Sequence, residues 1–245
     1  MRIVLLRHGE TDRNTTGRFQ GQADIPLNDA GVRQAQESAR ELRPGGWSAV
    51  YSSPLARAAQ TAAYAAGRLD VPHQRLAGLR ERDLGVLDGQ DRAEYARRQP
   101  HTMRRLLTDP GYAPPGGETG RAALSRFVTA LCAIAEPEAR RGTDVDAGTA
   151  ASRTVLAVTH GGVLNLLTSA LTRTGGSPGA MVGTCAAACV DIDWTSTGRP
   201  RAALRRWNAT PHMCAEVPAA TPALPFVDLD PLVSDAVNPM EVTRT

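Results

Sequence analysis

The segment IVLLRHGE, residues 3–10, places a short apolar run directly before an arginine and a histidine. Such a run is typical of a buried strand, so Arg7 and His8 stand where a strand gives way to a loop. In an α/β sheet, ligand-binding groups converge at the ends of strands. An imidazole can act as a covalent nucleophile, and a guanidinium can bind a phosphate through two parallel hydrogen bonds. The segment therefore favours phosphate chemistry over the plain alternative, a solvated loop histidine.

A second histidine has the same surroundings. His160 follows the apolar run 154–158 and precedes the pair Gly161-Gly162 and a helix-like stretch. Glycine lets a ligand approach the backbone closely, and the start of a helix favours an anion. Packing alone does not explain why two predicted strands are each followed by a histidine and a glycine. The two histidines therefore indicate a shared site for an anion.

Two further segments between these histidines carry charged groups. In SSPLARAAQT, residues 52–61, a turn leads into a helix that contains Arg57. In LRERDLGVLDG, residues 79–89, Glu81 lies in an arginine-rich loop. Taken singly, Arg57 fits a solvated helix face and Glu81 fits a surface ion pair with a neighbouring arginine, and Asp83 is a rival acid.

Taken in order, these segments resemble the histidine phosphatase superfamily, also called the phosphoglycerate mutase-like family, over roughly residues 2–207. The matching stretches are LLRHGETDRN at 5–14, RFQGQADIPLNDAGVRQA at 18–35, SSPLARAAQT at 52–61, LRERDLGVLDG at 79–89, PPGGET at 114–119 and VTHGGVLN at 158–165. One such match would be weak, whereas several in order are specific. The resemblance implies an α/β fold of three layers, α/β/α, with helices on both faces of a mostly parallel central sheet.

The resemblance also implies a role for each residue of the site. His8 matches the nucleophile that becomes phosphorylated, and Glu81 matches the proton donor. The rest of the phosphate pocket is matched by Arg7, Arg57 and His160. The residues expected to bind the substrate are Asn14, Gln20, Gly21, Arg82 and Gly161. The resemblance implies that no metal is needed, and we expect no other cofactor.

These residue types suit phosphoryl transfer. A phosphomonoester carries about two negative charges near neutral pH, and its transfer spreads charge over three oxygens, which positioned cations and N–H groups stabilise. The attacking nitrogen of His8 must be unprotonated, and Gly9 or the following loop is the candidate acceptor for its other nitrogen. Glu81 would protonate the leaving alkoxide, then act as the base for the water that hydrolyses the phosphohistidine.

Composition bounds the other classes of function. The 245 residues are 42% hydrophobic and carry a net charge of +3, which fits a real core and indicates neither nucleic-acid nor membrane partners. All 28 cationic residues are arginine, which excludes Schiff-base chemistry and a Walker-type loop. The sequence predicts no signal peptide and no membrane span. We expect a cytoplasmic protein with reduced thiols and no zinc site, because the cysteines are scattered, at Cys132, Cys185, Cys189 and Cys214.

The chain alternates between strand and helix patterns, as an α/β sheet requires. The predicted strands are 2–7, 48–52, 154–159, 186–194, 201–207 and a weaker 73–76, and the predicted helices are 29–42, 55–67, 120–136 and 162–172. We expect a histidine phosphatase domain at 1–210 with a lid-like insertion at about 90–118, a surface loop at 142–153, and a Pro-rich C-terminal tail at 211–245. The lid arginines indicate a second anionic group on the substrate, such as a carboxylate, unless they face solvent: Arg92, Arg97, Arg98, Arg104 and Arg105.

Several alternatives stay open at this point. The pattern Gly-x-Ser-x-Gly at Gly175–Gly179 suggests a serine hydrolase, although a nucleophile elbow needs a strand before it and a helix after it. A phospho-ligand binder without catalysis would be expected to lack His8 or Glu81. A cofactor-dependent phosphoglycerate mutase is the main rival, but the short span from His8 to His160 favours hydrolysis. Three segments, residues 18–22, PPGGET at 114–119 and RWNA at 206–209, are also similar to those of glucosyl-3-phosphoglycerate phosphatases. The expected partner is a small-molecule phosphomonoester substrate. A second copy of the chain, in a homodimer, is a further candidate partner.

Overall fold

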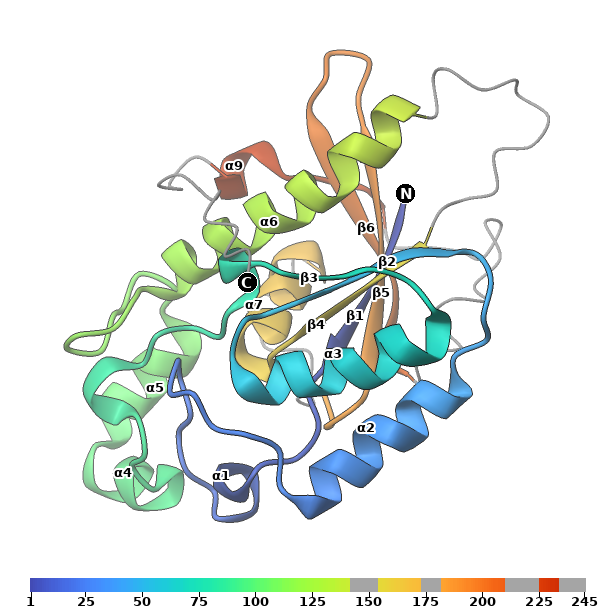
Figure 1. Ribbon diagram of the computed structural model, residues 1–245. Helices are drawn as coiled ribbons and strands as arrows, with labels where there is room; N and C mark the ends of the chain where they lie inside the picture. Colours follow the sequence, from blue (N-terminus) through green and yellow to red (C-terminus); the bar gives the residue numbers. More distant parts are fainter. Residues whose placement is uncertain (142–153, 173–181, 210–224, 234–245) are drawn as a thin grey trace.

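A mixed sheet forms the centre of the computed structural model, which describes residues 1–141, 154–172, 182–209 and 225–233. Within these residues the strand order is β3-β2-β4-β1-β5-β6-β7 (Figure 1). The strands are β1 (Arg2–Arg7), β2 (Trp47–Ser52), β3 (His73–Arg75), β4 (Thr154–Thr159), β5 (Ala187–Trp194), β6 (Pro200–Ala209) and β7 (Val227–Asp228). The strands β3, β2, β4 and β1 are parallel, whereas β5, β6 and β7 extend the sheet in antiparallel pairs.

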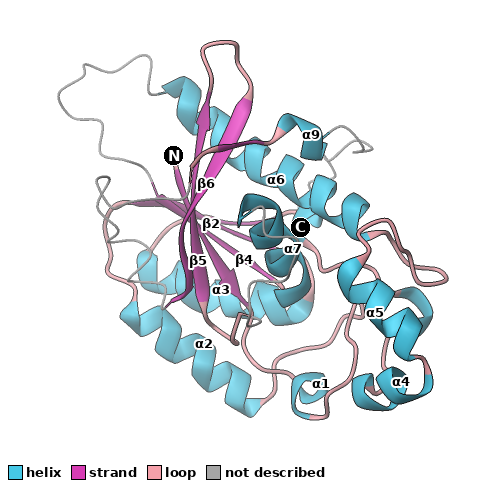
Figure 2. Cartoon of the chain, turned by 180° about the vertical axis from the view of Figure 1, so that it is seen from behind, coloured by secondary structure: helices cyan, strands magenta, loops and turns pink. Residues whose placement is uncertain are grey.

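Helices cover both faces of this sheet, as Figure 1 and the reverse view in Figure 2 show. One face carries α2 (Asp29–Glu41) and α3 (Ala56–Leu69), and the other carries α6 (Gly120–Arg141) and α7 (Gly161–Thr172). The short helices are α1 (Asp12–Thr15), η1 (Ala77–Leu79), η2 (Gly85–Leu87), α4 (Arg92–Arg98), α5 (Pro100–Thr108) and α9 (Asp230–Val233). The expected three-layer α/β/α fold is confirmed.

The alternation of side chains along β1 explains why its apolar run is continuous. Ile3 and Leu5 belong to the cluster that includes α6 and α7, while Val4 and Leu6 pack with the alanines of α3 on the opposite face. A central parallel strand buried on both faces requires apolar residues at every position. Because Arg7 pairs in register with Thr159, the ends of β1 and β4 bring His8 and His160 to the same edge of the sheet.

The predicted elements agree closely with the observed ones, including the weak strand β3. The largest difference is α6, which runs to Arg141 instead of ending at 136, because helix ends depend on packing and capping more than on periodicity. Asn28 caps α2, with its side chain accepting a hydrogen bond from the Gly31 N–H. The predicted loop 142–153 and the motif Gly175–Gly179 lie outside the described residues.

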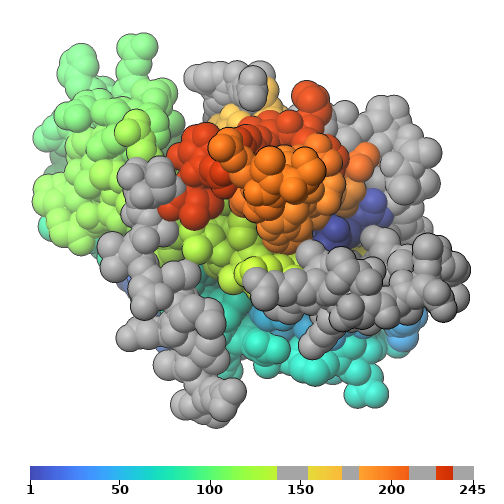
Figure 3. Space-filling view, turned by 90° about the horizontal axis from the view of Figure 1, so that it is seen from above, coloured from blue at the N-terminus to red at the C-terminus, as the bar shows by residue number. Residues whose placement is uncertain are grey.

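Part of the expected C-terminal tail belongs to the folded domain. The strand β7 pairs with β6, and Leu229 is buried in the core. The Ser125 hydroxyl on α6 donates to the Val233 carbonyl at 3.3 Å. Figure 3 shows this segment, in red, against the orange strands and the yellow-green helix α6. The boundary expected at 210 is therefore not where the folded part of the chain ends.

The described residues include no helix that is both long enough and apolar enough to span a membrane. Cys132 and Cys185 are free thiols, as expected, and Cys214 lies outside the described residues.

Candidate active site

A cavity of about 430 Å³ lies at the carboxyl ends of β1 and β4, beneath the lid formed by α4 and α5. The predicted site residues that line it are Arg7, His8, Asn14, Gln20, Gly21, Arg57, Glu81, Arg82 and Gly161. Sequence reasoning missed the apolar part of the wall, which is formed by Phe19, Leu84, Met103, Leu106, Leu107 and Leu166. Five of these side chains come from loops and the lid, and Leu166 comes from α7; no local pattern marks any of them as part of a cavity wall.

His8 is held as a neutral imidazole with a lone pair available for attack. Its side chain is buried, with Nδ1 2.6 Å from the Gly9 carbonyl oxygen and Nε2 3.3 Å from the Arg57 Nε. A carbonyl can only accept and a guanidinium can only donate, so the proton is on Nδ1 and the lone pair on Nε2. Burial, assisted by the charges of Arg57 and Arg7, lowers the pKa of His8 well below its ordinary value. The expected contact with Gly9 is confirmed.

Arg57 is fully buried in the first turn of α3, and its guanidinium is fixed by the backbone of the 20–24 loop. It donates to the Ala23 carbonyl at 2.8 Å and to the Gly21 carbonyl at 2.9 Å, which directs Nε toward His8. Burial lowers the pKa of Arg57 to about 10, so the group stays cationic at neutral pH. Gly21 has a φ of 44°, and a Cβ there would overlap the Asp88 carboxylate, so the loop requires glycine.

Arg7 and His160 carry polar atoms that have no hydrogen-bond partner among the described residues. Arg7 donates to the Val182 carbonyl at 2.6 Å, but its buried Nε is unpaired, as are both ring nitrogens of His160. The ring of His160 does not line the cavity; it lies against His8, with 5.1 Å between ring centroids. Burial, with Arg57 as the next cause, lowers the pKa of His160 well below its ordinary value. Buried polar atoms normally have partners, and an oxyanion bound in the cavity would accept a hydrogen bond from the Arg7 Nε–H.

Glu81 occupies the start of α7. Its carboxylate accepts hydrogen bonds from the N–H groups of Gly162 at 2.8 Å, Val163 at 3.0 Å and Arg82 at 2.8 Å. The first N–H groups of a helix have no partner within the helix and favour a negative charge. A Cβ at Gly162 would overlap this carboxylate, which explains the second glycine after His160. The helix start that we expected to hold a bound anion therefore holds Glu81, whose partners are backbone groups and not the neighbouring arginine side chains.

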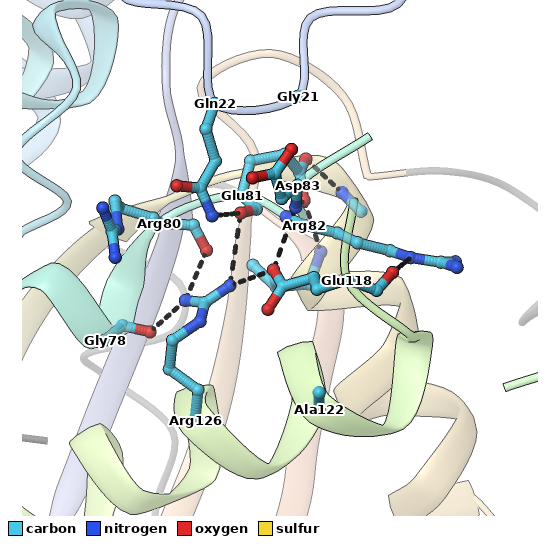
Figure 4. Close-up of polar contacts among 12 residues, drawn as sticks. Gly21, Gln22, Gly78, Arg80, Glu81, Arg82, Asp83, Glu118, Ala122 and Arg126 are labelled. Atoms are coloured by element: carbon cyan, nitrogen blue, oxygen red, sulfur yellow. Dashed lines mark hydrogen bonds and ion pairs between the residues drawn. The ribbon is translucent and has the colours of Figure 1, made fainter. Parts of the chain in front are cut away.

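A polar network, drawn in Figure 4, fixes the segment that carries Glu81. Arg126 reaches from α6 and donates to the carbonyls of Gly78 at 2.8 Å and Glu81 at 3.2 Å, and to the Glu118 carboxylate at 2.6 Å. Gln22 donates to the same Glu81 carbonyl at 3.0 Å. Sequence reasoning missed Arg126, because a single arginine on a helix has no local signal for such a role.

Arg82 lines the cavity, but all of its guanidinium nitrogens already bind the backbone. They donate to the carbonyls of Glu118 at 3.1 Å, Leu106 at 3.2 Å and Tyr112 at 2.6 Å. The residue expected to bind substrate thus ties the lid to the segment beside Glu81.

The rival acid lies away from the cavity. The Asp83 carboxylate accepts from the Gly85 N–H at 2.9 Å, in a turn, and Asp83 is not among the residues of the cavity wall. Glu118 accepts from the Asp83 N–H at 2.9 Å, and Thr119 caps α6 by accepting from the Ala122 N–H at 3.0 Å. Of the two nearby acids, Glu81 is therefore the one that can reach a ligand.

The lid arginines divide into two groups. Arg92 lines the cavity, whereas the other four are exposed: Arg97, Arg98, Arg104 and Arg105. Two of the exposed arginines form ion pairs within their own helix or just beyond it, Arg98 with Glu94 and Arg105 with Asp109. Of these five arginines, Arg92 is therefore the one that is placed to contact an anionic group of a substrate in the cavity.

The chain belongs to the histidine phosphatase superfamily (branch 1), whose family model matches residues 3–210. The glucosyl-3-phosphoglycerate phosphatase of Mycobacterium tuberculosis is 35% identical over 172 residues, which cover 69% of this chain and 74% of that protein. A solved complex of mycobacterial glucosyl-3-phosphoglycerate phosphatase with VO3 has a TM-score of 0.71 and 30% identity, and the match covers 85% of this chain and 99% of that chain.

Other relatives carry different names from the glucosyl-3-phosphoglycerate phosphatases. A bifunctional protein of Mycobacterium tuberculosis is 39% identical over 160 residues, which cover 65% of this chain but only 41% of that protein. The chain therefore spans less than half the length of the first curated relatives that it matches. The curated relatives also include a probable phosphoglycerate mutase of Proteus mirabilis.

Proposed function

We propose that this protein is a phosphomonoester hydrolase that acts through a phosphohistidine at His8, without a metal or other cofactor. The observation that carries the proposal is the tautomer of His8, whose lone pair lies on Nε2 beside the cationic Arg57. The substrate is a small phosphorylated metabolite of the phosphosugar or phosphoglycerate kind, in line with the named relatives.

In the first step the substrate's phosphoryl group takes the place of the contact between Arg57 and His8. The lone pair of Nε2 attacks phosphorus in line, an N–P bond forms, and the bond from phosphorus to the alcohol oxygen breaks. Arg7 and Arg57 stabilise the charge on the phosphoryl oxygens. Glu81, protonated when substrate binds, gives its proton to the leaving alkoxide, so that a neutral alcohol departs.

In the second step water attacks the phosphohistidine. Glu81, now a carboxylate, takes a proton from the water, the N–P bond breaks, and inorganic phosphate leaves. Three N–H groups hold the carboxylate in place for this role. His8 returns to its neutral state with the proton still on Nδ1.

The experiment that tests this proposal measures phosphate release from a panel of phosphomonoesters in the presence of a chelator. The panel contains p-nitrophenyl phosphate, 3-phosphoglycerate, glucosyl-3-phosphoglycerate, sugar phosphates and nucleotides. We expect release from at least one metabolite well above the rest. Conversion of 3- to 2-phosphoglycerate is followed in parallel, and conversion without phosphate release would contradict a hydrolase and favour a mutase. Tight binding with neither reaction would favour a phospho-ligand binder.

The pKa of His8 gives a prediction about pH. Because the pKa of His8 lies well below its ordinary value, we expect the imidazole to stay neutral, with Nδ1 protonated, at the pH near about 6.5 where an ordinary histidine takes up a proton. Below the ordinary pKa of histidine, His8 and His160 become protonated in the unfolded chain but stay neutral in the folded protein, because burial lowers the pKa of both. The unfolded state then binds more protons, so the free energy of unfolding falls as the pH falls. Nitrogen NMR of labelled histidine measures the tautomer, and a protonation midpoint of His8 near about 6.5 would contradict the expectation.

A further inference from the structure

The helix α7 presents a row of residues to the cavity. Gly161, Asn165 and Ser169 all line the cavity and are spaced four residues apart, which places them along one side of the helix. A Cβ at Gly161 would lie 3.2 Å from the Arg7 Nε, so this end of the row adjoins the phosphoryl site. Because a helix rises about 1.5 Å per residue, Asn165 lies about 6 Å farther along α7. Asn165 therefore borders the part of the cavity that is left for the alcohol part of a phosphomonoester.

Asn165 carries polar atoms that the protein itself does not pair. Its Oδ1 is buried, and across the described residues neither this oxygen nor the side-chain nitrogen has a hydrogen-bond partner. The hydroxyls of Thr168 and Thr172, on the same helix, each donate to the carbonyl one turn earlier at 2.8 and 2.9 Å. Buried polar atoms normally have partners, so the amide of Asn165 indicates a contact that a ligand completes.

The chemistry of an amide selects the kind of group that can complete this contact. The carbonyl oxygen of Asn165 only accepts hydrogen bonds, and the NH₂ group only donates them. A carboxylate or a phosphate could pair with the NH₂ group alone and would leave the buried Oδ1 without a donor. A hydroxyl both donates and accepts, so hydroxyls can pair with either end of the amide. The side chain therefore favours an uncharged, hydroxylated group over a further anion.

The apolar part of the cavity wall suits the same kind of group. Leu84 contributes a side chain from the loop before η2, and Met103 and Leu107 contribute theirs from the lid helix α5. A sugar ring has C–H groups on its faces and hydroxyls around its edge, so its faces can pack on these side chains while an edge hydroxyl reaches Asn165. A ring without hydroxyls could pack on the same wall, but it would leave the amide unpaired at a cost in free energy.

We propose that Asn165 binds a hydroxyl group in the alcohol part of the substrate, and that the protein thereby selects phosphorylated sugars over esters of similar size without hydroxyls. This inference rests on the proposed function and names the sugar class within it. Arg7 and Arg57 bind the phosphoryl group, whereas Asn165 determines which ester is accepted and takes no part in phosphoryl transfer.

The test compares two esters that differ in their hydroxyls. They are glucose 6-phosphate and tetrahydropyran-2-ylmethyl phosphate, which has the same ring without the hydroxyls. The ratio of their kcat/KM values measures how strongly hydroxyls are recognised, and we expect the wild type to prefer glucose 6-phosphate. In Asn165→Leu, which keeps the approximate size of the side chain, we expect the ratio to fall by about 5–100-fold, because a buried hydroxyl loses its partner. The change should appear mainly in KM.

Thr168→Val is the matched control, because Thr168 is a buried polar residue of the same helix and is not part of the cavity wall. Its hydroxyl bonds within the helix, to the Leu164 carbonyl, so the variant should keep the wild-type ratio. A wild type without a preference for glucose 6-phosphate, or an Asn165→Leu variant that loses activity equally on both esters, would overturn the proposal.

Binding separates this proposal from the proposed function. Calorimetry in the His8→Ala background, which cannot form the phosphohistidine, compares the affinities for the two esters with and without Asn165→Leu. If the wild type hydrolyses no phosphomonoester, the hydrolase proposal fails, yet tighter binding of glucose 6-phosphate that Asn165→Leu removes would still support the hydroxyl site. Equal affinity for both esters, or a preference that survives Asn165→Leu, would overturn the hydroxyl site whatever the activity.

Discussion

Replacement of His8 by alanine should lower kcat by roughly 10⁴-fold or more, because the loss of a covalent nucleophile removes the whole two-step route. Arg7 and Arg57 remain in the variant, and both have backbone contacts that do not involve the His8 ring. We therefore expect inorganic phosphate to bind the variant within about tenfold of its affinity for the wild type. Steady-state kinetics on the best substrate of the panel and calorimetry with phosphate measure the two effects.

His101→Ala is the control for this variant. His101 is an exposed histidine of the lid helix α5 and is not part of the cavity wall, so its loss should leave kcat unchanged. If His8→Ala kept activity within about tenfold of the wild type, His8 would not be the nucleophile.

Replacement of Glu81 by glutamine should slow esters of poor leaving groups far more than p-nitrophenyl phosphate. An alkoxide needs a proton as it leaves, and loss of a general acid costs about 10²–10⁴-fold, whereas p-nitrophenolate leaves without one. In the wild type the two carboxylate oxygens accept hydrogen bonds from the N–H groups of Gly162 and Val163 at the start of α7. A glutamine side chain has one oxygen and one NH₂ group, so it can accept only one of these two hydrogen bonds. Single-turnover formation of the phosphoenzyme isolates the step that is tested.

Turnover of p-nitrophenyl phosphate by the same variant should show a burst followed by slow release, because hydrolysis of the phosphohistidine still lacks its base. Asp83→Asn is the matched control, since Asp83 lies off the cavity and an asparagine oxygen can still accept from Gly85. Glu81 would not be the general acid if Glu81→Gln slowed both classes of ester equally. The same conclusion would follow if Asp83→Asn, and not Glu81→Gln, showed the dependence on the leaving group.

The sequence predicted the features that depend on local pattern. The apolar run of β1 and the strand before His160 are buried on both faces, and such strands are continuous in sequence. The glycines after both histidines mark close backbone approaches, which is why Glu81 can sit against Gly162. Both the sheet centre and the placement of His8 and His160 could therefore be inferred before the structure.

The sequence could not predict features that depend on contacts between distant segments. Arg126 and Glu81 meet only because α6 passes under the loop after η1, and nothing near either residue in the sequence encodes that approach. Arg82 lies beside Glu81 and matches a substrate position, yet its hydrogen bonds all go to lid carbonyls. Likewise, Leu229 enters the core from a Pro-rich segment whose composition is typical of an extended tail.

The central claim of this account is that the phosphoryl group passes through His8, and rapid-quench labelling tests it most directly. The protein is mixed with the ³²P-labelled form of its best substrate, quenched within one turnover, and analysed by peptide mass spectrometry. We expect label that is stable in base and labile in acid, on the peptide that contains His8, and no label in His8→Ala. Label that persists in His8→Ala, or turnover without any labelled protein, would contradict the account.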